Sequence, residues 1–213
     1  MNRLRQGFWV VFEGIDGVGK STVLELVFKE LERREYAVIQ TGEAGGTPLG
    51  REIRQLLDFA IDRPVPLAEY LLFAADRAQH MQRVIIPALK NRKVVISDRS
   101  TDSSLAYQGF GRGVDRDFIR LVNAATLQQL QPQRVFYLRL SVDDAFRRLE
   151  ERGGVATAFE REQKEFFERV ADGFDTIFAD RPDVITLDAT LNPSQLAHII
   201  CTDLLRSLHA IAE

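Results

Sequence analysis

The chain has 213 residues, of which 45% are hydrophobic and 28% charged, and its formal net charge is −3. This length suits one α/β domain with a substantial core, and the small net charge predicts no overall attraction to nucleic acid or to an anionic membrane. Its single cysteine, Cys201, excludes an internal disulfide and a cysteine-based zinc site, which favours a reducing, cytoplasmic location.

Apolar runs alternate along the chain with segments of helical period. The first run follows a basic segment and stops at Glu13, so it is too short for a signal peptide or a membrane span. Buried strands are predicted at residues 8–12, 36–41, 93–97, 135–140 and 183–187. Helices are predicted at residues 20–34, 67–90, 115–130, 142–152, 160–179 and 193–209, with a further one after Arg99. This alternation favours a parallel sheet with helices on both faces and ligands at the carboxyl ends of its strands.

A glycine-rich segment, GIDGVGKS, fits the pattern G-x-x-x-x-G-K-[ST] and lies between a predicted strand and a predicted helix. Glycines let backbone N–H groups point at phosphate oxygens, the lysine brings a charge to the outer phosphates, and the helix N-terminus favours an anion. We therefore predict an ATP site at this segment. Its residues are Gly14, Ile15, Asp16, Gly17, Val18, Gly19, Lys20, Ser21 and Thr22.

Mg²⁺ bound to the phosphates needs the Ser21 hydroxyl and a carboxylate at the end of a neighbouring apolar strand. Asp98 follows the strand predicted at 93–97 and supplies that carboxylate. Arg99 comes next, and its guanidinium fork suits a phosphate monoester better than a lysine would. No Asn-Lys-x-Asp element follows a strand, which argues against a guanine-specific switch.

Two later segments carry side chains that suit a nucleoside. Four-residue spacing places Ser103 with Tyr107, and Ser104 with Gln108, on common helix faces. The alternative is a polar surface helix. In LLFAADRAQH the same spacing pairs Phe73, which could stack on a base, with Arg77, which could donate to a base carbonyl. Spacing alone favours the alternative that Phe73 lies in the core and Arg77 in solvent, and His80 is expected to have a local structural role.

Together these motifs resemble those of bacterial thymidylate kinases. The resemblance rests on FEGIDGVGKST, GGT at residues 45–47, LLFAADRAQH, and DR with DSSLAYQGFGRG, in that order over nearly the whole chain. It implies a P-loop α/β fold with a five-stranded parallel sheet, one domain over residues 1–213 and a small lid at about 152–160. It also implies a homodimer that transfers the γ-phosphate of ATP to dTMP with Mg²⁺.

The resemblance also implies roles for single residues. Phe73 would stack on thymine, Arg77 would donate to its O4, Arg99 would hold the dTMP phosphate with Asp98 near the magnesium, and Asp16 would contact the sugar 3′-hydroxyl. The remaining residues of the dTMP pocket would be Glu43, Leu57, Ser103, Ser104, Tyr107 and Gln108. The adenine side of the ATP site would include Ala189 and Thr190, a weaker match.

The sequence departs from the family pattern in three places. Gly42 and Ala44 replace the usual arginine and proline of the second loop, Ser100 replaces the usual aromatic residue after Asp-Arg, and the usual Asp-Arg-x-Glu lid pattern is replaced at residues 157–160. The phosphate loop carries no arginine either. We therefore hypothesise that Arg152 or Arg161 is the catalytic arginine, and that it acts together with Lys20, Asp16, Asp98 and Arg99. The alternative is that both arginines are solvent-facing helix charges.

Two other functions stay open at this point. One is a kinase for another nucleoside monophosphate or for a deoxynucleoside, since one sequence does not exclude dUMP. The other is a nucleotide-binding protein that has lost phosphate transfer, which the altered lid and Gly42 support, whereas Lys20, Ser21, Asp98 and Arg99 oppose it.

Overall fold

The computed structural model describes residues 3–59, 62–153, 159 and 162–212. Five strands form one sheet in the order β2-β3-β1-β4-β5, and every neighbouring pair is parallel. The strands are β1 (Phe8–Glu13), β2 (Val38–Gly42), β3 (Val94–Asp98), β4 (Arg134–Arg139) and β5 (Val184–Asp188). The predicted parallel α/β sheet is therefore confirmed, with strand ends shifted by one or two residues.

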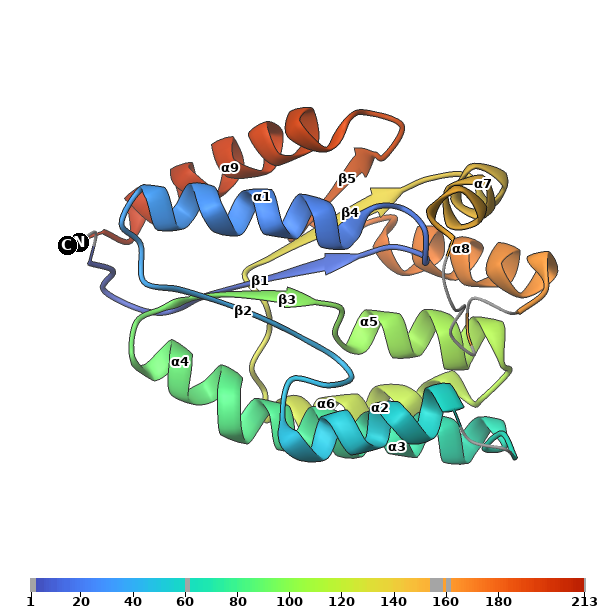
Figure 1. The fold of residues 1–213 in the computed structure, drawn as a ribbon. Helices are drawn as coiled ribbons and strands as arrows, with labels where there is room; N and C mark the ends of the chain where they lie inside the picture. Colours follow the sequence, from blue (N-terminus) through green and yellow to red (C-terminus); the bar gives the residue numbers. More distant parts are fainter. Residues whose placement is uncertain (1–2, 60–61, 154–158, 160–161, 213) are drawn as a thin grey trace.

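Helices cover both faces of the sheet, which explains why all six residues of β1 are buried. Figure 1 shows α1 (Lys20–Arg33) and α9 (Pro193–Ala210) side by side on one face. The other face carries α2 (Pro48–Phe59), α3 (Pro66–His80), α4 (Ile86–Lys90) and α6 (Arg116–Leu127). The end toward which the strands point carries α5 (Thr101–Ser104), α7 (Val142–Arg152) and α8 (Lys164–Phe178). Among the described residues no helix is long and apolar enough to cross a bilayer.

Two predicted helices have a more complex form in the structure. The helix predicted over residues 67–90 is a succession of α3, the π-helical segment η1 (Met81–Ile85) and α4. The π-helical segment ends two residues before Pro87, whose missing N–H removes one helical hydrogen bond. The helix predicted after Arg99 begins as α5 and continues as a second π-helical segment, η2 (Leu105–Gly111). The helix predicted to begin at residue 160 begins at Lys164.

Helix α2 was not predicted from the sequence. It begins after Thr47, whose hydroxyl accepts a 2.9 Å hydrogen bond from the Gly50 N–H, and Pro48 occupies its first turn. Threonine followed by proline is a known helix-start signal. The buried face of α2 includes Ile53 and Leu57, and the helix carries Arg54 to the carboxyl end of the sheet.

Candidate active site

The phosphate loop joins β1 to α1 through glycines in the left-handed region, with φ of 140° at Gly14, 86° at Gly17 and 92° at Gly19. A side chain at Gly14 would place its Cβ 2.5 Å from the Leu138 carbonyl oxygen, so this position requires glycine. The loop encloses Lys20, whose Nζ donates to the carbonyl oxygens of Gly14 at 2.9 Å and Ile15 at 3.0 Å. Burial lowers the pKa of Lys20 to about 8. The loop thus has the backbone geometry and the cation that a polyphosphate site needs.

A large cavity, here called the phosphate cavity, opens at the carboxyl ends of β1, β2 and β3. It lies against the phosphate loop, and Lys20, Ser21 and Asp98 contribute to its wall together with Arg148 and Arg152 of α7. The structure therefore brings the predicted loop, the predicted metal carboxylate and one of the two candidate arginines to a single cavity.

The residues proposed for Mg²⁺ fit this ion. Asp98 Oδ1 is buried and has no hydrogen-bond partner among the described residues, so it is free to accept a ligand. Ser21 lines the same cavity. Within the described parts of the chain no group of three or more His, Cys, Asp or Glu side chains forms a metal cage. A hydroxyl and one carboxylate beside a phosphate site match the way Mg²⁺ is usually held, through few protein ligands and the phosphates themselves.

Arg99 stands immediately after β3 and organises the centre of the site. Its guanidinium donates to Asp16 at 2.6 Å, to the Tyr107 hydroxyl at 3.0 Å, to the Ser103 hydroxyl at 3.0 Å and to the Gly14 carbonyl at 2.9 Å. Burial alone raises the pKa of Asp16, but the positive charges of Arg99 and Lys20 lower it to about 2. The structure thus places the Arg99 cation, which is bonded to the phosphate loop, and the Asp16 anion, which is part of that loop, between β1 and the predicted nucleoside pocket.

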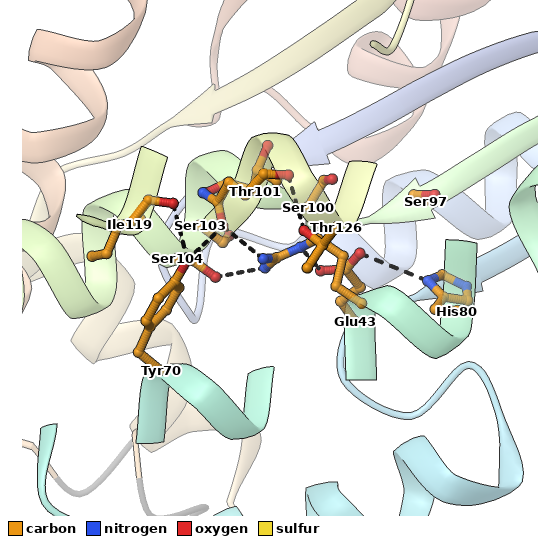
Figure 2. A network of polar contacts seen from close by, with 12 residues as sticks. Glu43, Tyr70, His80, Ser97, Ser100, Thr101, Ser103, Ser104, Ile119 and Thr126 are labelled. Atoms are coloured by element: carbon orange, nitrogen blue, oxygen red, sulfur yellow. Dashed lines mark hydrogen bonds and ion pairs between the residues drawn. The ribbon is translucent and has the colours of Figure 1, made fainter. Parts of the chain in front are cut away.

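Arg77 lies at the centre of a second buried network. Its side chain is 1% exposed and donates to Glu43 at 2.8 Å, Asn123 at 2.8 Å and Ser104 at 2.6 Å. Figure 2 shows that Glu43 and Ser104 enter this network from separate elements. It also shows the Tyr70 hydroxyl bonded to the Ile119 carbonyl. The alternative of a solvated Arg77 is therefore wrong. Guanidinium has five N–H donors, so two remain beyond these three bonds to the described residues.

A second cavity, here called the base cavity, lies between α3, η2 and α2. Its wall brings together most of the side chains predicted for a nucleoside: Phe73, Arg77, Ser103, Ser104, Tyr107 and Gln108. The four side chains from α5 and η2 are at most 8% exposed, so the alternative of a polar surface helix is wrong.

The two cavities meet, and four residues line both of them: Asp16, Glu43, Arg54 and Arg99. Arg99 and Arg54 are the two cations at this junction. A group seated between the cavities would therefore contact positive charge and lie next to whatever occupies the phosphate loop. This arrangement suits a donor phosphate on one side and an acceptor phosphate on the other.

Comparisons with known proteins agree with this geometry. The model of the family described as thymidylate kinase matches residues 12–200. The chain belongs to the thymidylate kinase family. It is 44% identical over 178 residues to a thymidylate kinase of Pelotomaculum thermopropionicum, covering 83% of this chain and 82% of the relative. It is 41% identical over 196 residues to that of Chlorobaculum tepidum, covering 88% and 92%. The resemblance and the prediction of a kinase are confirmed, and neither alternative function gains support.

Other residues assigned by resemblance to the thymidylate kinase family lie farther from the cavities. Leu57 is 4% exposed in the main core and lines neither cavity. After β5, the buried Ala189 accepts a 2.8 Å bond from Arg148 through its carbonyl oxygen, and the Thr190 hydroxyl donates to Asp188. The lid predicted at about 152–160 falls largely outside the described residues, as does Arg161.

Several site residues were not assigned a role from the sequence. Arg54 reaches the junction of the cavities from the unpredicted α2, paired with Asp58 at 2.6 Å. Arg148 donates to the Val18 and Ala189 carbonyls and so joins the phosphate loop to the loop after β5. Phe159 lines the base cavity, with its ring centre 5.8 Å from that of Phe73. Only the helix-start signal at Thr47 could have indicated any of these, through α2.

Glu13 supports the site from the end of β1. It too was not assigned a role from the sequence. It is fully buried at the end of β1 and accepts bonds from the Ser100 N–H at 2.9 Å and the Ser103 hydroxyl at 2.5 Å. These contacts fix the turn that carries Arg99. Burial raises the pKa of Glu13 to about 8.

The burial of Asp76 predicts a pH-dependent stability for this chain. This residue is fully buried on α3, and burial followed by the charge of Glu43 raises its pKa from 3.8 to about 6. Between these values the folded state holds a proton that the unfolded state releases. The free energy of unfolding therefore falls as pH rises from about 4 to 6, by up to about 1.4 kcal/mol per unit.

We expect that in Asp76→Asn the free energy of unfolding lacks this fall between pH 4 and 6. The variant should also be more stable than the parent at pH 7. Urea unfolding at pH values from 4 to 7 measures the effect. The control is Asp117→Asn, an exposed acid on α6 whose side chain is 89% accessible. Parallel stability curves for the parent and Asp76→Asn would contradict the assignment.

Proposed function

We propose that this protein transfers the γ-phosphate of ATP to dTMP, giving ADP and dTDP. The observation that carries the proposal is the junction of two cavities, one against the phosphate loop and one lined for a nucleoside, at Asp16, Arg54 and Arg99. Because the chain belongs to the thymidylate kinase family, we infer that the acceptor in the second cavity is dTMP.

On the donor side, the backbone N–H groups of the phosphate loop bind the ATP phosphates and Lys20 contacts the outer ones. Mg²⁺, held by Ser21 and Asp98, would neutralise charge on those phosphates. Arg148 joins the loop to Ala189 and Thr190, which we propose for the adenine side. This support keeps the loop and the adenine side in fixed relation while the γ-phosphate faces the junction.

On the acceptor side, Phe73 stacks on thymine and the two further N–H groups of Arg77 face the base carbonyl O4. Asp16 accepts from the sugar 3′-hydroxyl, and the Tyr107 ring and hydroxyl close the pocket beside the sugar. Arg99, with Arg54, holds the phosphate. This phosphate is ionised near neutral pH, so its oxygen attacks without a general base.

Transfer then depends on position and charge. The dTMP oxygen attacks the γ-phosphorus in line, and negative charge spreads over the moving group. Arg99 lines both cavities at their junction, and Lys20 and Arg152 line the phosphate cavity beside it. These preorganised cations stabilise the transition state without rearrangement at the moment of transfer.

A coupled assay of ADP formation with ATP, Mg²⁺ and each nucleoside monophosphate in turn tests the proposal. We expect strong turnover with dTMP, weaker turnover with dUMP and negligible turnover with dCMP, dGMP or AMP. Lack of turnover with any acceptor, in protein that still binds ATP and dTMP, would contradict the proposal.

We propose in addition that the protein is a homodimer that associates through α3 and α6. These helices pack against each other and expose large apolar side chains that soluble monomers rarely gather on one face. They are Leu67, Leu71, Phe118 and Leu121. A self-complementary apolar face of this kind suits a two-fold interface.

Leu121, which is 70% exposed, is the most accessible of these side chains. We expect Leu121→Glu to convert the dimer to a monomer because it brings a charge into this apolar face. Sedimentation velocity measures the mass in solution. Ile199→Glu, at an exposed apolar position on the opposite face, serves as the control and should leave the dimer intact. A monomeric parent would contradict the proposal.

We propose a cytoplasmic location. Cys201 is buried on α9 as a free thiol, which fits a reducing compartment. Burial raises its pKa to about 11, so the thiol is unreactive. ATP as the donor also fits this compartment. Cell fractionation with immunodetection tests the location, and recovery outside the cytoplasm would contradict it.

A further inference from the structure

The amide of Gln108 in the base cavity is held in one orientation by a neighbouring carboxylate. Gln108 Nε2 donates to Glu69 Oε1 at 2.9 Å, and the two residues are 2% and 6% exposed. Gln108 comes from η2 and Glu69 from the first turn of α3, so only the fold brings them together. The other end of the amide, Oε1, accepts no hydrogen bond from any described residue.

The carboxylate of Glu69 is itself fixed. Arg112 donates from Nε to Glu69 Oε1 and from a terminal nitrogen to Oε2, each at 3.3 Å. Arg112 is held in turn by Glu162 at 2.8 Å and by the ring of Phe166, whose centre lies 4.5 Å from the guanidinium carbon. The first turn of a helix also favours a negative charge. Glu69 therefore presents an acceptor to Gln108 in a fixed position.

An amide turned by 180° would place Gln108 Oε1 against the Glu69 carboxylate. That orientation opposes two acceptors and loses a charge-assisted hydrogen bond, which is roughly twice as strong as a neutral one. Glu69 thus selects between two orientations that Gln108 could otherwise adopt with equal ease. In the selected orientation the Nε2 group faces Glu69 and the carbonyl oxygen is left for a ligand.

Thymine and cytosine differ at the edge that these groups would read. Thymine presents the O4 acceptor and the N3–H donor, whereas cytosine presents an N4 amino donor and an N3 acceptor. Arg77 can only donate and cannot adapt to cytosine. Gln108 could adapt by turning its amide, because Nε2 would then donate to the cytosine N3.

We propose that Glu69 is a specificity-determining positioning residue, which fixes Gln108 with its carbonyl oxygen toward the base and so makes the site reject cytosine. The inference rests on the proposed function, because it requires the base of the acceptor to occupy this cavity. Glu69 acts through Gln108 and does not itself contact the base.

Glu69→Gln tests the proposal because a neutral amide accepts either orientation of Gln108. We expect the ratio of kcat/KM for dTMP to that for dCMP to fall by about tenfold or more, the value of one hydrogen bond. The loss for dTMP should appear in KM, with kcat nearly unchanged, because Glu69 lies away from the phosphate loop. A general structural defect would lower kcat for both acceptors and leave the ratio unchanged.

The control is Glu168→Gln, which makes the same change at an exposed carboxylate of α8 that pairs with Lys164 and lies outside this network. Its ratio should equal that of the parent. Where Glu69→Gln yields no folded protein, Glu69→Asp withdraws the carboxylate from Gln108 and should give an intermediate ratio. An unchanged ratio in a folded Glu69 variant, beside an active parent, overturns this inference alone. A parent that fails to phosphorylate dTMP overturns the proposed function instead.

Discussion

Replacing Arg99 with alanine should lower kcat/KM for dTMP by about 10³-fold or more, with ATP binding changed only a few-fold. Arg99 lies where the two cavities meet and is paired with Asp16 at 2.6 Å. An arginine that stabilises the charge of a moving phosphoryl group contributes about 10³–10⁵-fold to phosphate transfer. Steady-state kinetics and calorimetric titration with ATP measure the two quantities separately.

Arg99→Lys should recover only part of the activity. Lysine restores the charge but not the planar fork that contacts Asp16, Ser103 and Tyr107 together. Arg120→Ala is the control, since this arginine lies on α6 with a 58% exposed side chain. Full activity in Arg99→Ala, or full rescue by lysine, would contradict the role given to the fork.

The second large effect is expected at the end of α7. Arg152→Ala should lower kcat by about 10²-fold or more with little change in KM, because phosphate transfer needs an arginine that the phosphate loop does not supply. Arg152 lines the phosphate cavity. Arg147, on the same helix but with a 63% exposed side chain paired to Asp144, is the matched control.

Arg161→Ala should be measured beside these variants, because the sequence offers both arginines as replacements for the missing lid arginine. If neither variant loses more than a few-fold in kcat, the hypothesis of a substitute arginine is wrong. If only Arg161→Ala loses activity, the catalytic charge comes from the segment after Arg152 and not from α7.

The strands and the phosphate loop could be predicted because their signals are local. The burial of Phe8 to Phe12 in β1 follows from an unbroken apolar run, and the loop is specified by its glycines and Lys20. Spacing also placed Ser103 and Tyr107 on one face, and both contact Arg99 although η2 is a π-helix.

Helix α2 and the supporting contacts of the site were harder to predict. Arg54 arrives at the junction only because α2 packs on α3, and Arg148 only because α7 passes the phosphate loop. Spacing favoured a solvated Arg77, yet the fold surrounds it with Glu43 and other partners that are distant in sequence. Contacts of this kind depend on tertiary packing, which a periodic pattern does not encode.

The central claim is that the two cavities form one continuous site for a donor and an acceptor. A reagent that joins adenosine to thymidine through a 5′-to-5′ polyphosphate chain tests it most directly by calorimetric titration. We predict one molecule bound per chain, competition by ATP and by dTMP separately, and strong weakening by Arg99→Ala. Binding that only one of the two nucleotides competes away would mean that the cavities do not act together, and would contradict the account.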